Sequence, residues 1–205
     1  MAKLFLGLDS STQSLSAVVI DLDTRKVSYE KSLNFDQALP QFKTRHGVLS
    51  NRDPLVKHSS PKLWAAALDL LFAQMKKDGV PLGKILAVSG SGQQHGSVYL
   101  NEKAPAALAS LDPKKSLEEN LDGVFARKTS PIWMDSSTAK ECMEIRKKLG
   151  GIKFTASRTG SDTFERFTGP QIRKFCKTEP KAYAQTAHIA LVSSYMASLD
   201  RKSVV

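Results

Sequence analysis

The strongest constraint on the fold is the stretch Leu4–Asp21, which predicts a buried strand, a tight polar turn and a second strand. One carboxylate, Asp9, ends the first strand, and hydroxyl and amide side chains fill the turn from Ser10 to Ser14. Backbone N–H groups and hydroxyls in such a turn can donate to a phosphate, and the carboxylate can hold Mg²⁺ or a water molecule on it. The chain has no Gly-rich loop of the Walker type with its Lys, so a nucleotide bound here would need a different fold.

Length and composition are those of an ordinary globular chain. The 205 residues are 41% hydrophobic and 24% charged, which is enough for one domain with a real core and argues against disorder. No run approaches the roughly 20 apolar residues that a membrane helix needs, and the first residues lack a cleavable signal pattern. Cys142 and Cys176 lie far apart without metal-ligand spacing, so we expect reduced thiols in a cytoplasmic protein.

The net charge of +10 could indicate an anionic partner such as nucleic acid. The Lys and Arg residues are instead spread in short helical groups such as Arg146–Lys148, and aromatic residues, at 7%, do not interleave with them. This distribution favours solvated helix faces over a nucleic-acid-binding module. The excess charge could also belong to a piece that is balanced by residues not present here.

The first half of the chain predicts an antiparallel meander followed by a helix. The expected strands are Leu4–Leu8, Ser16–Leu22 and Lys26–Leu33, and residues 36–60 are expected to form a loop. Pro61 opens the helix, and Gly79 is expected to end it as a left-handed cap. The residues that share the apolar face of this helix are Leu63, Trp64, Ala67, Leu68, Leu71, Phe72 and Met75.

The second half alternates strands and helices. A buried strand is expected at Ile85–Ser89, a returning strand at Ser97–Leu100, and an irregular insertion with a short helix at 101–130. The later expected elements are extended Pro131–Met134 and helices from Ser136 to Leu149, from Gln171 to about Lys177 and from Pro180 to about Leu199. This order fits an α/β domain with helices packed on a sheet, and the lack of a C-terminal strand suggests the beginning of a longer chain.

Four segments together resemble a known family. Residues 6–14 resemble the first phosphate motif of the carbohydrate kinases that share the ribonuclease-H-like fold of actin and hexokinase. Residues 89–99, 130–139 and 165–172 look like xylulokinases, in particular the longer, eukaryote-like form, and the insertion at 101–130 also suits that form. Any one motif alone would be weak, but all four occur in the order of the family.

The resemblance implies a two-lobed enzyme roughly two to three times this length. Residues 1–200 would form part of its N-terminal lobe, a mixed sheet with flanking helices, and 201–205 a tail. Such an enzyme transfers the γ-phosphoryl group of ATP, with Mg²⁺, to the 5-hydroxyl of D-xylulose in the cleft between its lobes. The alternatives are a kinase for another ketose or polyol of the superfamily, and a non-catalytic sugar-binding protein.

The resemblance gives Asp9 the role of positioning Mg²⁺ on the phosphates, and Thr12 and Gln13 the role of phosphate contacts. An Asx turn or cap would also explain Asp9, and ordinary hairpin polarity would explain the other two. His95 is the best candidate for a sugar contact, because a neutral imidazole can donate to one hydroxyl and accept from another. Gln94 beside it could instead brace the turn.

Three further residues match family positions around the sugar. The planar guanidinium of Arg166 can donate to two vicinal hydroxyls, although an ion pair with Glu165 would also explain it. Trp133 and Asp135 match a motif that lines the sugar site, but Trp133 could be a core aromatic and Asp135 a helix cap. The remaining histidines, which no motif surrounds, are read as structural or surface residues: His46, His58 and His188.

The catalytic base of the family is an Asp in a Gly-Asp-Asn type segment well beyond position 205, and this chain contains no Gly-Asp-Asn. We therefore expect these residues to hold part of a sugar site and the first phosphate loop without turnover. An unfinished lobe should also expose apolar surface, so we expect self-association.

Overall fold

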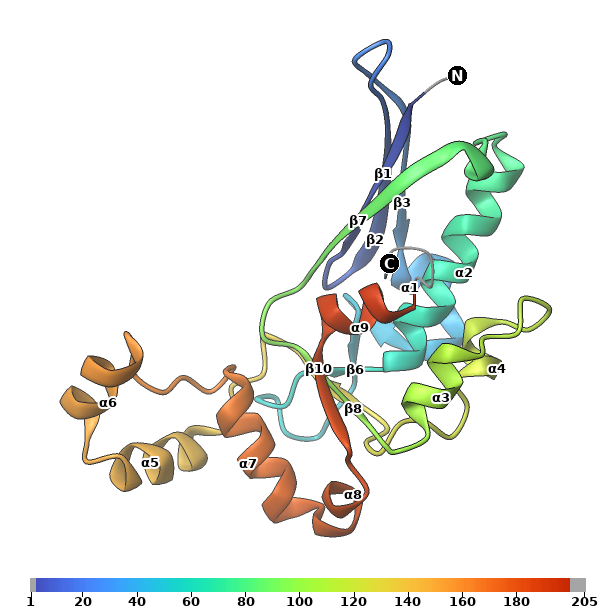
Figure 1. The fold of residues 1–205 in the computed structure, drawn as a ribbon. Coiled ribbons are helices and arrows are strands. Elements are labelled where there is room, and N and C mark those ends of the chain that lie inside the picture. The colour runs from blue at the N-terminus through green and yellow to red at the C-terminus, as the bar shows by residue number, and fades with distance from the viewer. Residues whose placement is uncertain (1–2, 200–205) are drawn as a thin grey trace.

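A four-stranded mixed sheet forms the first half of the molecule (Figure 1). The computed structural model describes residues 3–199, so the expected tail 201–205 lies outside the described residues. The strands, in the spatial order β3-β2-β1-β7, are β3 (Lys26–Asn34), β2 (Ser14–Asp21), β1 (Leu4–Ser10) and β7 (Ile85–Gly92). The antiparallel meander of β1, β2 and β3 is confirmed, and β7 pairs parallel to β1.

The core lies between one face of this sheet and helix α2 (Pro61–Lys77). Alternate residues of the strands, such as Leu6, Leu15 and Val19, point to the same side and are buried there, as the period-two pattern of a half-buried sheet requires. The expected apolar face of α2 is buried against them, with Phe72 only partly buried. Gly79 has a φ of +82° just past the helix, which confirms the expected left-handed termination.

Short elements connect the sheet with the rest of the chain. The expected loop 36–60 holds several pieces of regular structure: α1 (Phe35–Ala38), a 3₁₀ turn (Pro40–Phe42), β4 (Thr44–Arg45), β5 (Val48–Leu49) and β6 (His58–Ser59). The insertion 101–130 carries α3 (Ala104–Ala109) and α4 (Leu117–Asn120), and a second 3₁₀ turn (Leu82–Lys84) precedes β7. Strand β8 (Ser97–Leu100) is present as expected, and β9 (Ser130–Pro131) pairs with β6.

The predicted helix from Pro180 to Leu199 is wrong in the middle. The structure has α8 (Pro180–Ala184), strand β10 (His188–Leu191) and α9 (Val192–Ser198) in its place. β10 pairs antiparallel with β8, and the Ala187 N–H donates to the Leu100 carbonyl just before it. This pairing with a strand 90 residues earlier overrides the local helical pattern. The sequence of residues 188–191 alone does not indicate such a long-range partner.

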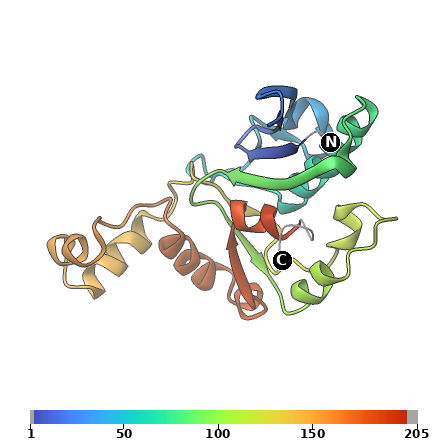
Figure 2. The same cartoon turned by 45° about the horizontal axis from the view of Figure 1, so that its top comes forward.

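The other helices of the second half are α5 (Ala139–Lys148), α6 (Ile152–Thr159) and α7 (Thr168–Thr178). α6 was not expected, and α5 begins three residues after the predicted Ser136 because a turn occupies residues 137–138. The expected extended run to Met134 ends at Pro131, where a turn carries Trp133. α5 and α6 form an arm that projects from the rest of the molecule (Figures 1 and 2).

Strand β7 differs from the prediction in its burial. The sequence predicts a buried strand, but Leu86 is 64% exposed and most of its neighbours in β7 are exposed as well. The reason is position, because β7 stands at the end of the sheet with β1 as its one strand neighbour among residues 3–199. None of the helices in that described part of the chain has the length and hydropathy needed to cross a bilayer.

Candidate functional site

The carboxylate of Asp9 lies at the end of β1, clamped between two serine hydroxyls. Ser11 Oγ donates to its Oδ2 and Ser91 Oγ to its Oδ1, each at 2.6 Å. Ser91 belongs to β7, and the parallel register of β1 and β7 places it beside Asp9. Both carboxylate oxygens are therefore held in a fixed orientation by short, charge-assisted hydrogen bonds.

The turn after Asp9 leaves backbone donors available to a ligand. The Ser11 N–H closes the turn on the Ser14 carbonyl at 2.9 Å, whereas the N–H groups of Thr12 and Gln13 meet no acceptor within residues 3–199. The Gln13 carbonyl accepts from the Phe35 N–H, and its side chain is exposed. Adjacent free N–H groups in a turn form a concave donor surface for an anion.

His95 lies in the loop between β7 and β8, in a backbone conformation with a φ of +63°. Its ring packs on Phe167, with the ring centroids 5.0 Å apart. Burial lowers the pKa of the His95 imidazole below its ordinary value of 6.5, and the charge of Arg166 lowers it further. The neutral ring, which can both donate and accept, is therefore favoured at neutral pH.

The loop from β7 is tied directly to the turn at the end of β1. The Gln93 N–H donates to the Ser10 carbonyl at 2.9 Å, so the backbones that carry His95 and Asp9 are bonded to one another. The indole Nε1 of Trp133 donates to Thr12 Oγ1 at 2.8 Å, which joins a third segment to the same turn. The expected alternative of a core position for Trp133 does not hold, because the side chain is 45% exposed.

These segments line an open cavity of about 510 Å³. It is lined by Asp9, Ser11, Thr12, Gly92, Gln93, Gln94, His95, Trp133 and Arg166. The predicted phosphate residues Asp9 and Thr12 thus share a cavity with the predicted sugar residues, while Gln13 and Asp135 are not among its lining. Arg166 is exposed, and its guanidinium carbon lies 5.8 Å and 6.0 Å from the ring centres of Phe164 and Phe167.

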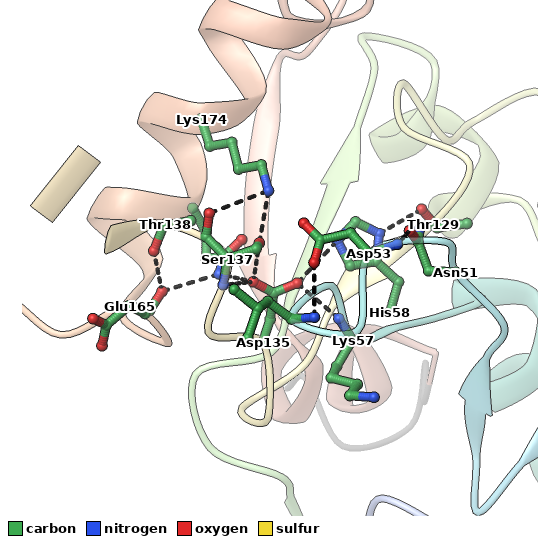
Figure 3. Close-up of polar contacts among 12 residues, drawn as sticks. Asn51, Asp53, Lys57, His58, Thr129, Asp135, Ser137, Thr138, Glu165 and Lys174 are labelled. Atoms are coloured by element: carbon green, nitrogen blue, oxygen red, sulfur yellow. Dashed lines mark hydrogen bonds and ion pairs between the residues drawn. The ribbon is translucent and has the colours of Figure 1, made fainter. Parts of the chain in front are cut away.

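Asp135 is the centre of a buried polar network (Figure 3). Its carboxylate accepts hydrogen bonds from the backbone N–H groups of Lys57 and Ser137 and from the side-chain amide of Gln171. His58 Nε2 lies 3.5 Å from Oδ2, and His58 Nδ1 bonds Thr129 Oγ1. Burial alone would raise the pKa of the Asp135 carboxyl, but these donors outweigh it and hold that pKa well below its usual range.

The network confirms a structural position for His58, and His46 and His188 are exposed as expected. Asp135 does not form the helix cap that was the alternative, because the N-cap position of α5 is Thr138. Two residues were missed by sequence reasoning, Ser91 and Phe167. The register of β1 against β7 that brings Ser91 to Asp9, and the packing that brings Phe167 to His95, exist only in the folded chain.

The single carboxylate of Asp9 suits a cation whose other ligands are waters and phosphate oxygens. Within the described residues 3–199, no three His, Cys, Asp or Glu side chains come together as a metal site of their own. Mg²⁺ commonly binds through one or two carboxylates together with waters and phosphate oxygens. A single, oriented carboxylate beside free backbone donors fits that kind of site.

The chain is similar to known proteins over nearly its whole length. No protein-family model matches the chain. Xylulose kinase 2 of Arabidopsis thaliana is 48% identical over 197 residues, which are 96% of this chain and 35% of that protein. Xylulose kinase of Mus musculus is 44% identical over 194 residues, which are 95% of this chain and 35% of that protein. The chain therefore spans about a third of the length of the curated relatives it matches.

A solved structure described as a xyloylose kinase from Brucella ovis matches with a TM-score of 0.70 at 20% identity. The match covers 95% of this chain and 33% of that one. At this identity the likeness shows the fold alone, and it confirms the expected α/β class with the actin/hexokinase-like ATPase fold.

Proposed function

We propose that this chain, which belongs to the xylulose kinases of the carbohydrate kinase family, carries a D-xylulose site and the first phosphate turn of an ATP-dependent kinase. The whole enzyme would transfer the γ-phosphoryl group of ATP to a hydroxyl of the sugar. We also propose that residues 1–200 form part of the N-terminal lobe of such an enzyme.

One observation carries this proposal. The same cavity is lined by Asp9 and Thr12 from the turn after β1 and by His95 and Arg166 from two distant loops. Phosphoryl transfer depends mainly on holding the two substrates in line and on neutralising charge. A cavity lined both by anion donors and by groups for sugar hydroxyls supplies that positioning.

Each group has a distinct proposed role. The N–H groups of Thr12 and Gln13 and the Thr12 hydroxyl donate to phosphate oxygens. The neutral His95 ring and the Arg166 guanidinium bond the sugar hydroxyls, with Gln94 and Trp133 as further walls. Asp9 would hold Mg²⁺, which neutralises phosphate charge when bound. Asp135, whose oxygens already accept from protein donors, fixes the loop that carries Trp133.

In the family that the chain resembles, an Asp in a Gly-Asp-Asn type segment takes the proton of the attacking hydroxyl. The chain has no such segment. We therefore propose that the 205 residues bind sugar without turnover. A coupled assay with the chain, MgATP and D-xylulose should show no sugar-dependent release of ADP.

Calorimetry with D-xylulose tests the binding site. We expect the wild-type chain to bind, and His95→Ala and Arg166→Ala to weaken binding about tenfold or more, because each removes hydrogen bonds to the ligand. His188→Ala and Arg158→Ala are matched controls. His188 is exposed on β10, and Arg158 lies 5.3 Å from the ring centre of Phe154 in α6, outside the cavity.

The proposal fails if the wild-type chain shows no heat of binding, or if the two site variants bind as well as the two controls. Parallel titrations with other ketoses and with glycerol decide the substrate class. Tighter binding of one of those ligands than of D-xylulose would replace the proposed sugar with that ligand.

A further inference from the structure

One hydrogen bond joins two walls of the cavity to which we assign different ligands. The Trp133 indole Nε1 donates to Thr12 Oγ1 at 2.8 Å, across 121 positions of sequence. Thr12 belongs to the turn after β1, which carries the proposed phosphate donors, and Trp133 to the segment between β9 and α5, on the proposed sugar wall. Both residues line the cavity, so this bond connects its two parts directly.

The backbone that carries Trp133 is anchored on both sides of the residue. Ile132 is buried, and its N–H donates to the Lys57 carbonyl at 3.0 Å. The Asp135 N–H closes the turn on the Ile132 carbonyl at 2.9 Å, and the Asp135 carboxylate accepts from the Lys57 N–H. The indole is therefore aimed at Thr12 by a turn whose two ends are bonded to the same segment before β6.

The backbone around Thr12 is held as well. The Ser11 N–H donates to the Ser14 carbonyl at 2.9 Å, and the Phe35 N–H donates to the Gln13 carbonyl at 2.9 Å, one on each side of Thr12. Since both backbones are braced, the freedom that remains lies in the two side chains. The bond between them restricts that freedom.

The bond also decides what the Thr12 hydroxyl can offer a ligand. An indole N–H is a donor only, so the hydroxyl accepts from it and directs its own proton elsewhere. Ionised phosphate oxygens are acceptors. With the indole in place, the hydroxyl is oriented as a donor before an anion arrives, and such preorganisation lowers the cost of binding.

We propose that Trp133 is a positioning residue for phosphate, and that a sugar in the cavity strengthens phosphate binding through it, which rests on the proposed function of the cavity. The Trp133 side chain is 45% exposed, so its ring is available for a sugar to pack on. A sugar that restricts the ring removes part of the cost of holding Thr12 in place. By linkage, phosphate must raise the affinity for the sugar by the same factor.

Calorimetric titration with inorganic phosphate tests this coupling, with the chain free and then saturated with D-xylulose, at constant ionic strength. The quantity to compare is the ratio of the two phosphate dissociation constants, which we expect to be about five in the wild-type chain. The net charge of +10 attracts any anion, but it acts equally in both titrations and cancels from the ratio. A change in the affinity for one ligand alone cancels in the same way.

Four variants locate the coupling in this bond. Trp133→Phe keeps a ring without the N–H, and Thr12→Val keeps the shape of the side chain without the acceptor, so both ratios should fall close to one. Thr12→Ser retains the hydroxyl and should restore most of the wild-type ratio. Thr24→Val is the matched control, because Thr24 is exposed in the turn between β2 and β3, outside the cavity, and its ratio should match the wild type.

The indole N–H signals in an NMR spectrum of the chain give a second measurement. The chain has two tryptophans, and Trp64 is fully buried in the core, so its signal serves as an internal reference. The Trp133 signal should shift on addition of D-xylulose, on addition of phosphate and in Thr12→Val, while that of Trp64 stays in place.

The outcomes separate this coupling from the function on which it rests. A wild-type ratio close to one, measured while both ligands bind, overturns the role of Trp133 and leaves the proposed function intact. A ratio that survives in Trp133→Phe or in Thr12→Val also overturns it, because the coupling then runs through other groups. A wild-type chain that binds no D-xylulose, or no phosphate in either state, contradicts the proposed function and the coupling together.

Discussion

At the scale of single residues, the hydroxyl groups around the first turn differ in what they can offer a ligand. Ser11 and Ser91 give their protons to Asp9, so they present only lone pairs. Thr12 accepts from the Trp133 indole, so its own proton is free to be donated. The turn therefore has a side of oxygen lone pairs suited to a cation and a donor side suited to phosphate.

The proposed contact of His95 with the sugar predicts an affinity that depends on pH. Its pKa in the folded chain is below 6.5, so its contribution is present above pH 6.5 and is lost as the pH falls through the lowered value. Protonation would also place a second cation beside Arg166. We predict that the affinity for D-xylulose, measured by calorimetry, falls as the pH is lowered from 7.5 to 5.

The control for this prediction is His95→Gln, which keeps a donor and an acceptor without a titrating group. Its affinity should be lower than that of the wild-type chain and flat over the same pH range. An equally steep pH dependence in His95→Gln would assign the titration to another group.

At the scale of elements, the turn after β1, which we propose binds phosphate, is supported by the hairpin of β4 and β5. Gly47 joins these two strands with a φ of +74°, and a Cβ on it would lie 1.9 Å from the Thr12 carbonyl oxygen. The Asp36 carboxylate accepts from the Gly47 and His46 N–H groups, which fixes the hairpin. The position of Thr12 thus depends on a glycine 35 residues later in the chain.

Gly47→Ala should destabilise the chain by about 3 kcal/mol, from the strained φ together with the clash against backbone. Gly123→Ala separates the two causes and should cost about 1 kcal/mol, because Gly123 has a φ of +71° but an added methyl group there would meet nothing within 4 Å. Urea unfolding of the two variants measures the difference. If the two variants lose the same free energy of unfolding, the turn at Thr12 can move away from the methyl group added at residue 47.

At the scale of the whole molecule, Asp135 connects parts that are distant in sequence. It bonds the segment before β6 through Lys57, the turn before α5 through Ser137, and α7 through Gln171. Ser137 and Gln171 lie a few residues from Trp133 and Arg166, which line the cavity, so the network ties together the segments that carry these two residues.

We predict that Asp135→Asn lowers the free energy of unfolding by about 2 kcal/mol at pH 7, because the amide cannot accept at both positions. The pKa of Asp135 is lowered on folding, so its contribution is present above about pH 3.8 and is lost as the pH falls further. The gap between wild type and variant in urea unfolding should therefore shrink from pH 5 to pH 2.5. A constant gap would mean that the charge of Asp135 does not matter.

Local patterns in the sequence were sufficient for the sheet meander and for α2, and the family resemblance named most residues of the candidate site. Alternation of apolar residues decides which face of β1 and β2 is buried, and the proline at the start and glycine after the end delimit α2. The motifs at residues 6–14, 89–99, 130–139 and 165–172 named Asp9, Thr12, Gln94, His95, Trp133 and Arg166, which all line one cavity.

Only the tertiary structure decided what depends on contacts between distant segments. Pairing with β8 makes a strand of residues 188–191 within a helical pattern, and the place of β7 at the end of the sheet exposes a strand that reads as buried. The contacts of Asp9 with Ser91 and of Thr12 with Trp133 join residues 82 and 121 positions apart. The physical reason is the same in each case. The intrinsic preference of a segment for helix or strand is small, so a long-range pairing that satisfies more backbone or buried groups overrides it.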